Sequence, residues 1–149
     1  MGSGEWGVGS GESGVGSREL EQGIVMDSVQ SYRDLKVWRL GMTLAVECYQ
    51  LTRTYPREEM FGMTSQIRRA AVSIPANIAE GYGRESTGAY IQFLRISQGS
   101  LKELETHLLL SNEVGICQET ATAPLLQHAD NLGRMLRALI RSLQLRQQR

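Results

Sequence analysis

The sequence predicts an all-α fold: an antiparallel up-down-up-down four-helix bundle with a kinked second helix, preceded by a disordered N-terminal tail. Four segments carry apolar residues in steps of three and four, the spacing of one face of an amphipathic helix. No segment shows a convincing alternation with a period of two, which is the pattern of half-buried strands. Short loops join the four segments, and short loops favour antiparallel neighbours in a bundle.

The first 30 residues are predicted to form the disordered tail, and residues 31–149 to form the bundle domain. Seven of the sixteen glycines fall within the first seventeen residues, and ordering so much glycine costs more backbone entropy than such a segment recovers. Met26 lies just ahead of the patterned region. The tail is therefore interpreted as an upstream extension, with a flexible tether as the alternative.

The first helix is predicted to begin at Ser31 and to end near Pro56. Ser31 with Asp34 three residues later has the spacing of a helix N-cap. Two apolar stripes follow: one is Leu35, Trp38, Met42, Ala45, Tyr49 and Thr52, and the other is Val37, Leu44 and Leu51 with Gly41 and Cys48 between them. A single bundle core uses only one stripe of a helix, so this helix has two faces to bury.

The remaining three helices are predicted from their own apolar stripes. The second runs from about Met63 to Tyr82, with Ile67, Ala71, Ile74 and Ile78. The third runs from about Ser86 to Val114 and is closed by Gly115, with Tyr90, Phe93, Ser97, Leu101, Leu104 and Leu108. The fourth begins near Thr122, with Pro124 in its first turn and the stripe Leu125, Ala129, Leu132, Leu136, Leu139 and Leu143.

Pro75 lies in the middle of the second helix. It lacks the N–H that would bond to the Ala71 carbonyl, at a cost of roughly 3 kcal/mol in a helix interior. The helix either bends between Ser73 and Pro75 or breaks there with Ser73 as a new cap. Position 76 is Ala, so no capping box supports a break, and a continuous bent helix is favoured.

A polar stripe follows the second helix beside small residues. We expect this stripe to be at least partly buried where the second helix meets another helix, in its own bundle or in a neighbouring protomer. A solvated helix face is the alternative. The stripe consists of Arg69, Ser73, Asn77, Glu80 and Arg84.

The sequence gives no sign of catalytic or metal chemistry. Neither His107 nor His128 has a Glu three residues before it, as a di-iron bundle would require. Cys48 and Cys117 are isolated, which is typical of ordinary thiols in a reducing compartment. The first residues show neither the basic start nor the apolar centre that a signal peptide has, and no run of about 18 apolar residues occurs. We expect a cytoplasmic protein that is not an enzyme, needs no cofactor or metal, and does not enter a membrane.

Four segments of the chain resemble a known protein family. The segments that carry the resemblance are "SYRDLKVW", "YQLTRTYPREEMFGMTSQIRRAAVSIPANIAEGYGR", "FLRISQGSLKELETHLLLS" and "LGRMLRALIRSL". The chain resembles the four-helix bundle proteins encoded in intervening sequences of bacterial 23S ribosomal RNA genes. The resemblance covers about residues 31 to 145. It implies a ring-shaped homopentamer and no catalytic mechanism. The structural or interface motif that it implies is Gln66, Arg69, Ser73, Pro75, Asn77, Glu80 and Gly81, followed by Arg84.

Two functions remain open. The first is a homo-oligomer that binds RNA or DNA without strong sequence specificity, because residues 31–149 carry fifteen Lys and Arg against eleven Asp and Glu. The resemblance extends distantly to the accessory variability protein of diversity-generating retroelements, which implies nucleic-acid binding through a basic surface. The second function is a scaffold that docks a partner protein, with nucleic-acid binding incidental. The expected nucleic-acid contacts are Arg68, Arg84, Arg95, Lys102, Arg134, Arg137 and Arg141, and solvated surface cations are the alternative interpretation.

Overall fold

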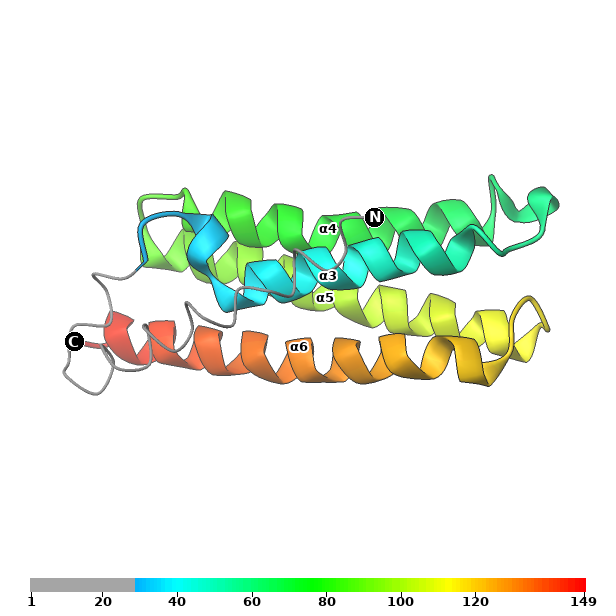
Figure 1. The fold of residues 1–149 in the computed structure, drawn as a ribbon. Coiled ribbons are helices and arrows are strands. Elements are labelled where there is room, and N and C mark those ends of the chain that lie inside the picture. The colour runs from blue at the N-terminus through cyan, green and yellow to red at the C-terminus, as the bar shows by residue number, and fades with distance from the viewer. Residues whose placement is uncertain (1–28) are drawn as a thin grey trace.

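The computed structural model describes residues 29–149, which form four helices lying side by side along one axis (Figure 1). The residues that it describes contain no strand, so the prediction of an all-α fold with four helices is confirmed. The predicted disordered tail is residues 1–30, and residues 1–28 of it lie outside the described residues. The elements are η2 (Tyr32–Asp34), α3 (Lys36–Thr52), η3 (Arg57–Glu59), α4 (Met63–Tyr82), α5 (Thr87–Glu113) and α6 (Glu119–Gln147).

The four helices enclose one apolar core. Helix α4 packs against both α3 and α5, and α6 packs against both α5 and α3. In Figure 1 the α3–α4 and α5–α6 connections lie at one end of the molecule, and the α4–α5 connection lies at the other. The large apolar side chains that are almost wholly buried are Leu44, Ile67, Ile74, Ile78, Leu94, Leu101, Leu104, Leu108, Leu132 and Leu136.

The start of the first helix differs from the prediction. The capping box of Ser31 and Asp34 is present, but it caps the short 3-10 helix η2. Leu35 then takes an extended conformation with ψ of 127°, and α3 begins only at Lys36. Because an extended residue cannot continue the intrahelical hydrogen bonds, the capping box and α3 belong to two separate elements.

Helix α3 buries one of its two apolar stripes more completely than the other. Val37, Gly41, Leu44 and Cys48 lie in the core. Of the other stripe, Ala45 and Thr52 are buried, Leu35, Trp38 and Met42 are half-buried, and Tyr49 is 39% exposed. Part of an apolar stripe therefore stays at the surface of the single chain.

Helix α4 has the predicted bounds and continues through Pro75. Pro75 is buried, and a Cβ atom at Gly41 of α3 would lie 3.4 Å from the Pro75 Cβ. The proline ring thus packs against a glycine on the neighbouring helix. The bend at Pro75 stays a prediction.

The last two helices are joined by a short turn that ends α5 with Gly115. Ser86 caps α5, and its Oγ accepts a hydrogen bond from the Ala89 N–H over 3.1 Å. Gly115 has φ of +81°, the left-handed conformation that closes many helices. Helix α6 begins at Glu119, three residues before the predicted start, so Pro124 lies in its second turn. Pro124 has no N–H to donate to the Thr120 carbonyl. Both residues are exposed, so water can form a hydrogen bond to that carbonyl instead.

No helix among residues 29–149 combines the length and apolar character that crossing a membrane requires.

Candidate nucleic-acid interface

The contact between α5 and α6 is fixed by two glycines. A Cβ atom at Gly133 of α6 would lie 3.4 Å from Leu101 Cδ2 of α5, and one at Gly88 would lie 3.3 Å from Gln147 Nε2. Residue numbers therefore fall along α5 as they rise along α6. This register places Arg95 level with the residues between Arg137 and Arg141.

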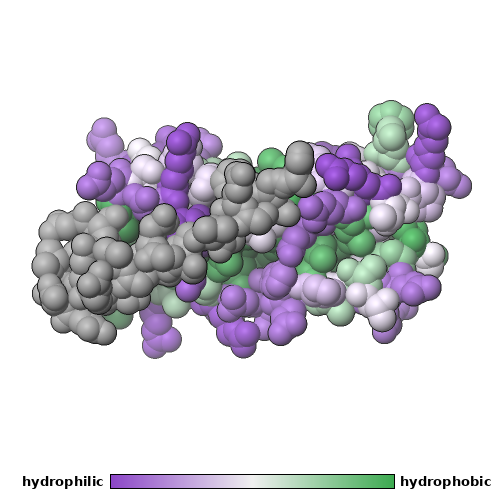
Figure 2. All heavy atoms as spheres, viewed as in Figure 1, coloured by the Kyte–Doolittle hydropathy of each residue, from purple (hydrophilic) through white to green (hydrophobic). Residues whose placement is uncertain are grey.

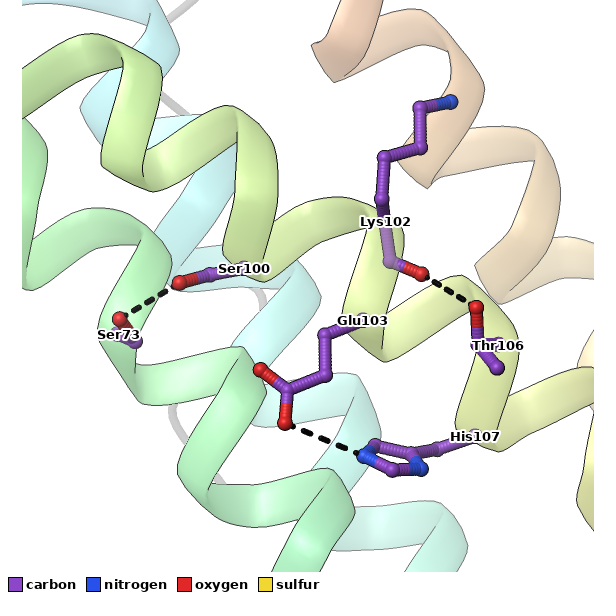
Figure 3. A network of polar contacts seen from close by, with 6 residues as sticks. All are labelled: Ser73, Ser100, Lys102, Glu103, Thr106 and His107. Carbon is purple, nitrogen blue, oxygen red and sulfur yellow. Dashed lines mark hydrogen bonds and ion pairs between the residues drawn. The ribbon is translucent and has the colours of Figure 1, made fainter.

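Five exposed cations lie on the outer side of this contact. Helix α5 meets α4 through Ser97 and Ser100, and the row of Arg95 and Lys102 lies on the other side of α5. Figure 3 shows Lys102 extending from α5 toward the tan ribbon of α6, away from the Ser73–Ser100 contact. On α6 the α3 side is marked by His128, whose Nδ1 lies 2.8 Å from Glu47 Oε1 of α3, and a second row of cations follows Gly133 on nearly the opposite side. We call this surface the α5–α6 basic face: Arg95, Lys102, Arg134, Arg137 and Arg141, all exposed.

Two of these cations have carboxylate partners and three do not. Lys102 Nζ lies 3.1 Å from Glu105 Oε1, and Arg134 Nη2 lies 3.1 Å from Asp130 Oδ2. In the part of the chain that the structure describes, no ion pair or hydrogen bond engages the side chains of Arg95, Arg137 or Arg141. With its two carboxylates the face carries a net charge of +3, a charge that attracts phosphate.

The structure places Arg68 away from this face, between α3 and α4. Its Nε donates a hydrogen bond to Thr52 Oγ1 over 2.8 Å, and its guanidinium carbon lies 4.5 Å from the centroid of the Tyr49 ring. Thr52 Oγ1 in turn donates to the Cys48 carbonyl over 2.8 Å. Arg68 is half-buried and ties two helices together.

Arg84 also lies apart from the α5–α6 basic face. Its Nη2 lies 2.7 Å from Glu80 Oε2, and its guanidinium carbon lies 4.7 Å from the centroid of the Phe93 ring. Both members of the ion pair are about half-exposed, a setting in which such pairs contribute little to stability.

The polar stripe of α4 divides into a bonded centre and exposed flanks. Ser73 Oγ lies 2.8 Å from Ser100 Oγ of α5 (Figure 3). Asn77 Nδ2 donates to the Ser73 carbonyl over 2.8 Å and to Ser73 Oγ over 3.0 Å. Ser73 and Asn77 are half-buried within the single bundle. The remaining stripe residues Arg69, Glu80 and Arg84 are exposed in the single chain, and so is Gln66, which belongs to the motif that the resemblance implies.

Gly81 lets α4 and α5 approach closely at the end of this stripe. A Cβ atom there would lie 2.7 Å from Phe93 Cβ and 3.1 Å from Tyr90 Cδ1. Burial, with a smaller effect of nearby Tyr82, raises the pKa of Tyr90 to about 12. Gly81 is therefore required by packing against two aromatic side chains.

Sequence reasoning missed a second polar cluster, which lies where the η3 turn meets the α5–α6 connection. Tyr55 is buried, and its hydroxyl lies 3.4 Å from Cys117 Sγ. Asn112 Nδ2 donates to Thr122 Oγ1 over 2.8 Å. Burial, with the hydrogen bond to Cys117, raises the pKa of Tyr55. Sequence periodicity gives no signal for this cluster, because Asn112 falls in the predicted third helix, Cys117 in the loop after it and Thr122 at the predicted start of the fourth helix. Among residues 29–149 no three His, Cys, Asp or Glu side chains gather as metal ligands would.

Known proteins were found that are similar to this chain in sequence or in fold. The model of the family described as 23S rRNA-intervening sequence protein matches residues 33–138. No curated protein matches this chain. A crystal structure from Bacteroides thetaiotaomicron, of a protein of unknown function from the S23 ribosomal protein family, is similar with a TM-score of 0.63 and 23% identity, over 70% of this chain and 97% of that one. That likeness shows the shared fold. Since the family model covers well over half of its residues, this chain belongs to the 23S rRNA-intervening sequence protein family.

Proposed function

We propose that this chain is a non-enzymatic, cytoplasmic homo-oligomer whose α5–α6 basic face binds the phosphate backbone of RNA or DNA without strong sequence specificity. The observation that carries the proposal is the convergence of Arg95, Arg137 and Arg141 on one face with no carboxylate partner among residues 29–149. Arginine presents planar, paired donors to phosphate. Exposed arginines on two packed helices thus offer an anion-binding surface.

The proposal includes the bundle order and the assembly. We infer an up-down-up-down order with α4 bent at Pro75, which the opposite numbering of α5 and α6 supports. Copies are proposed to meet through what we call the α3–α4 apolar stripe: Trp38, Met42, Tyr49 and Val72. The heptad spacing of the α3 residues suits a helix as the partner. The family resemblance implies that five copies form a ring, which would repeat the basic face around the assembly.

A charge-reversal experiment tests the nucleic-acid proposal. Arg95→Glu/Arg137→Glu/Arg141→Glu should weaken binding of fluorescent RNA and DNA of unrelated sequence by at least about a hundredfold at low salt. The control is Lys36→Glu/Arg53→Glu/Arg57→Glu, whose three residues are exposed on α3 and the α3–α4 connection and give the same change in net charge. It should weaken binding by less than about tenfold. Equal losses in the two variants, with helix content unchanged, would assign the binding to net charge and contradict the site.

The second candidate function is a scaffold that docks a partner protein. It is favoured by apolar side chains at the end of the bundle that holds the α3–α4 and α5–α6 connections, where Figure 2 shows hydrophobic residues gathering. Phe61 is 93% exposed, Met60 52% and Val114 60%. Large apolar side chains that are exposed together at one end of a protein are typical of interaction surfaces. An absence of nucleic-acid binding at low salt would favour this second candidate.

A further inference from the structure

The α5–α6 basic face has two parallel rows of cations. Arg95 and Lys102 are seven residues apart on α5, and Arg134 and Arg141 are seven residues apart on α6, so each row is about 10 Å long. Packed helices lie about 8–10 Å apart. The register set by Leu101 and Gly133 makes the rows overlap along the bundle axis. The cations therefore form two parallel rows, one on each helix, rather than one line of charge.

The same face offers no aromatic ring to a base. Helix α6 contains no Phe, Trp or Tyr. The two aromatic residues of α5, Tyr90 and Phe93, lie against Gly81 of α4, on the other side of the helix. Proteins that hold single strands combine a basic groove with aromatic side chains on which bases stack. This surface supplies charge without stacking.

A surface that binds only through charge favours the polyanion with the highest charge density. A duplex carries one negative charge per roughly 1.7 Å of its axis, and each neutralised phosphate releases more counterion from a duplex than from a single strand. A minor groove of B-form DNA about 6 Å wide separates two backbones. Two cation rows on neighbouring helices can contact both backbones, whereas a single strand presents only one.

Resting on the proposed function, we propose that the ligand of the α5–α6 basic face is a nucleic-acid duplex, held by the phosphates of both strands. The row on α5 contacts one backbone and the row on α6 contacts the other. Duplex RNA and duplex DNA share this chemistry, and separate probes distinguish them.

The test compares duplexes with single strands on the full chain. Fluorescence anisotropy would measure binding to duplex DNA and duplex RNA of about 20 base pairs, and to oligo-dT and oligo-U of equal phosphate content, at about 50 mM salt. At least one duplex should bind about tenfold or more tightly than the single strand of the same sugar, and the preferred duplex identifies the source. Single strands that bind as tightly as both duplexes would overturn the inference.

A one-row variant tests the two-row geometry independently. Arg95→Gln/Lys102→Gln removes the α5 row, so it should weaken duplex binding more than single-strand binding and reduce the ratio between them. An unchanged ratio would contradict the assignment of one row to each strand. If strands and duplexes bind equally and both lose affinity in Arg95→Glu/Arg137→Glu/Arg141→Glu, the proposed function stands and only the duplex inference fails. If no probe binds the wild type, both fail.

Discussion

Gly81 of α4 packs directly against Phe93 of α5, and a Cβ atom at Gly81 would lie only 2.7 Å from the Phe93 Cβ. A methyl group cannot fit there unless the two helices move apart. Gly99 of α5 is the opposite case, since nothing lies within 4 Å of a Cβ built on it. A substitution at Gly81 therefore tests helix packing, whereas the same substitution at Gly99 tests helix propensity alone.

Gly81→Ala should lower the free energy of unfolding by about 1–3 kcal/mol through overpacking. Gly99→Ala should raise it by up to about 1 kcal/mol, because alanine is the better helix former. Urea denaturation followed by circular dichroism measures both. A neutral or stabilising Gly81→Ala would show that α4 and α5 do not approach as closely as described.

The polar stripe of α4 should respond unequally to mutation. Asn77→Ala removes two hydrogen bonds at a half-buried position and should cost about 1–2 kcal/mol. Glu80→Ala removes a half-exposed ion pair and should cost less than about 0.5 kcal/mol. Thermal melts of both variants test this. Equal losses near 2 kcal/mol would mean that the exposed half of the stripe is covered, as a neighbouring protomer would cover it.

Stability should fall in mildly alkaline solution because of Cys48. Burial, with a smaller effect of Glu47, raises the pKa of its thiol from 9.0 to about 12. Above pH 9.0 the unfolded thiol ionises and the folded one does not, so stability present below that pH is lost as the pH rises toward the folded pKa. The loss should be about 1 kcal/mol between pH 9 and about pH 10. Denaturation of Cys48→Ala, compared with wild type at both pH values, should show a smaller loss; equal losses would contradict the assignment.

The assembly should depend on the α3–α4 apolar stripe. Met42→Glu/Val72→Glu places two charges on that stripe and should reduce the mass in light scattering to that of one chain, because buried unpaired charge is costly. Ile96→Glu is the control, since Ile96 is a 49% exposed apolar residue on α5. Its mass should match wild type. Dissociation by Ile96→Glu and not by the double variant would move the interface to α5.

The fold follows from sequence periodicity more fully than the site does. The bounds of α4 and the closing role of Gly115 could be predicted because glycine, proline and apolar spacing act within one segment. The choice between the two stripes of α3 could not, since both are apolar and only contacts such as Gly41 with Pro75 decide it. The start of α6 was predicted late because an exposed Pro124 is tolerated in the second turn.

The candidate site depends on register, which no single segment encodes. Arg95 and Arg137 are 42 positions apart in the sequence, and they share a face only because Leu101 packs on Gly133. Arg68 and Arg84 carry the same charge but stand on other faces, beside Tyr49 and Phe93. Composition therefore predicts an attraction to phosphate, and the packing of α5 on α6 selects the residues.

The salt dependence of nucleic-acid affinity tests the central claim most directly. The logarithm of the binding constant would be measured against the logarithm of salt concentration for wild type and for Arg95→Gln/Arg137→Gln/Arg141→Gln. Each phosphate contact that is lost should make the slope less steep by about one unit. The variant lacks three arginines, so the slope should become less steep by about three units for each protomer that contacts the nucleic acid. An unchanged slope, whatever the affinity, would show that these arginines do not contact phosphate.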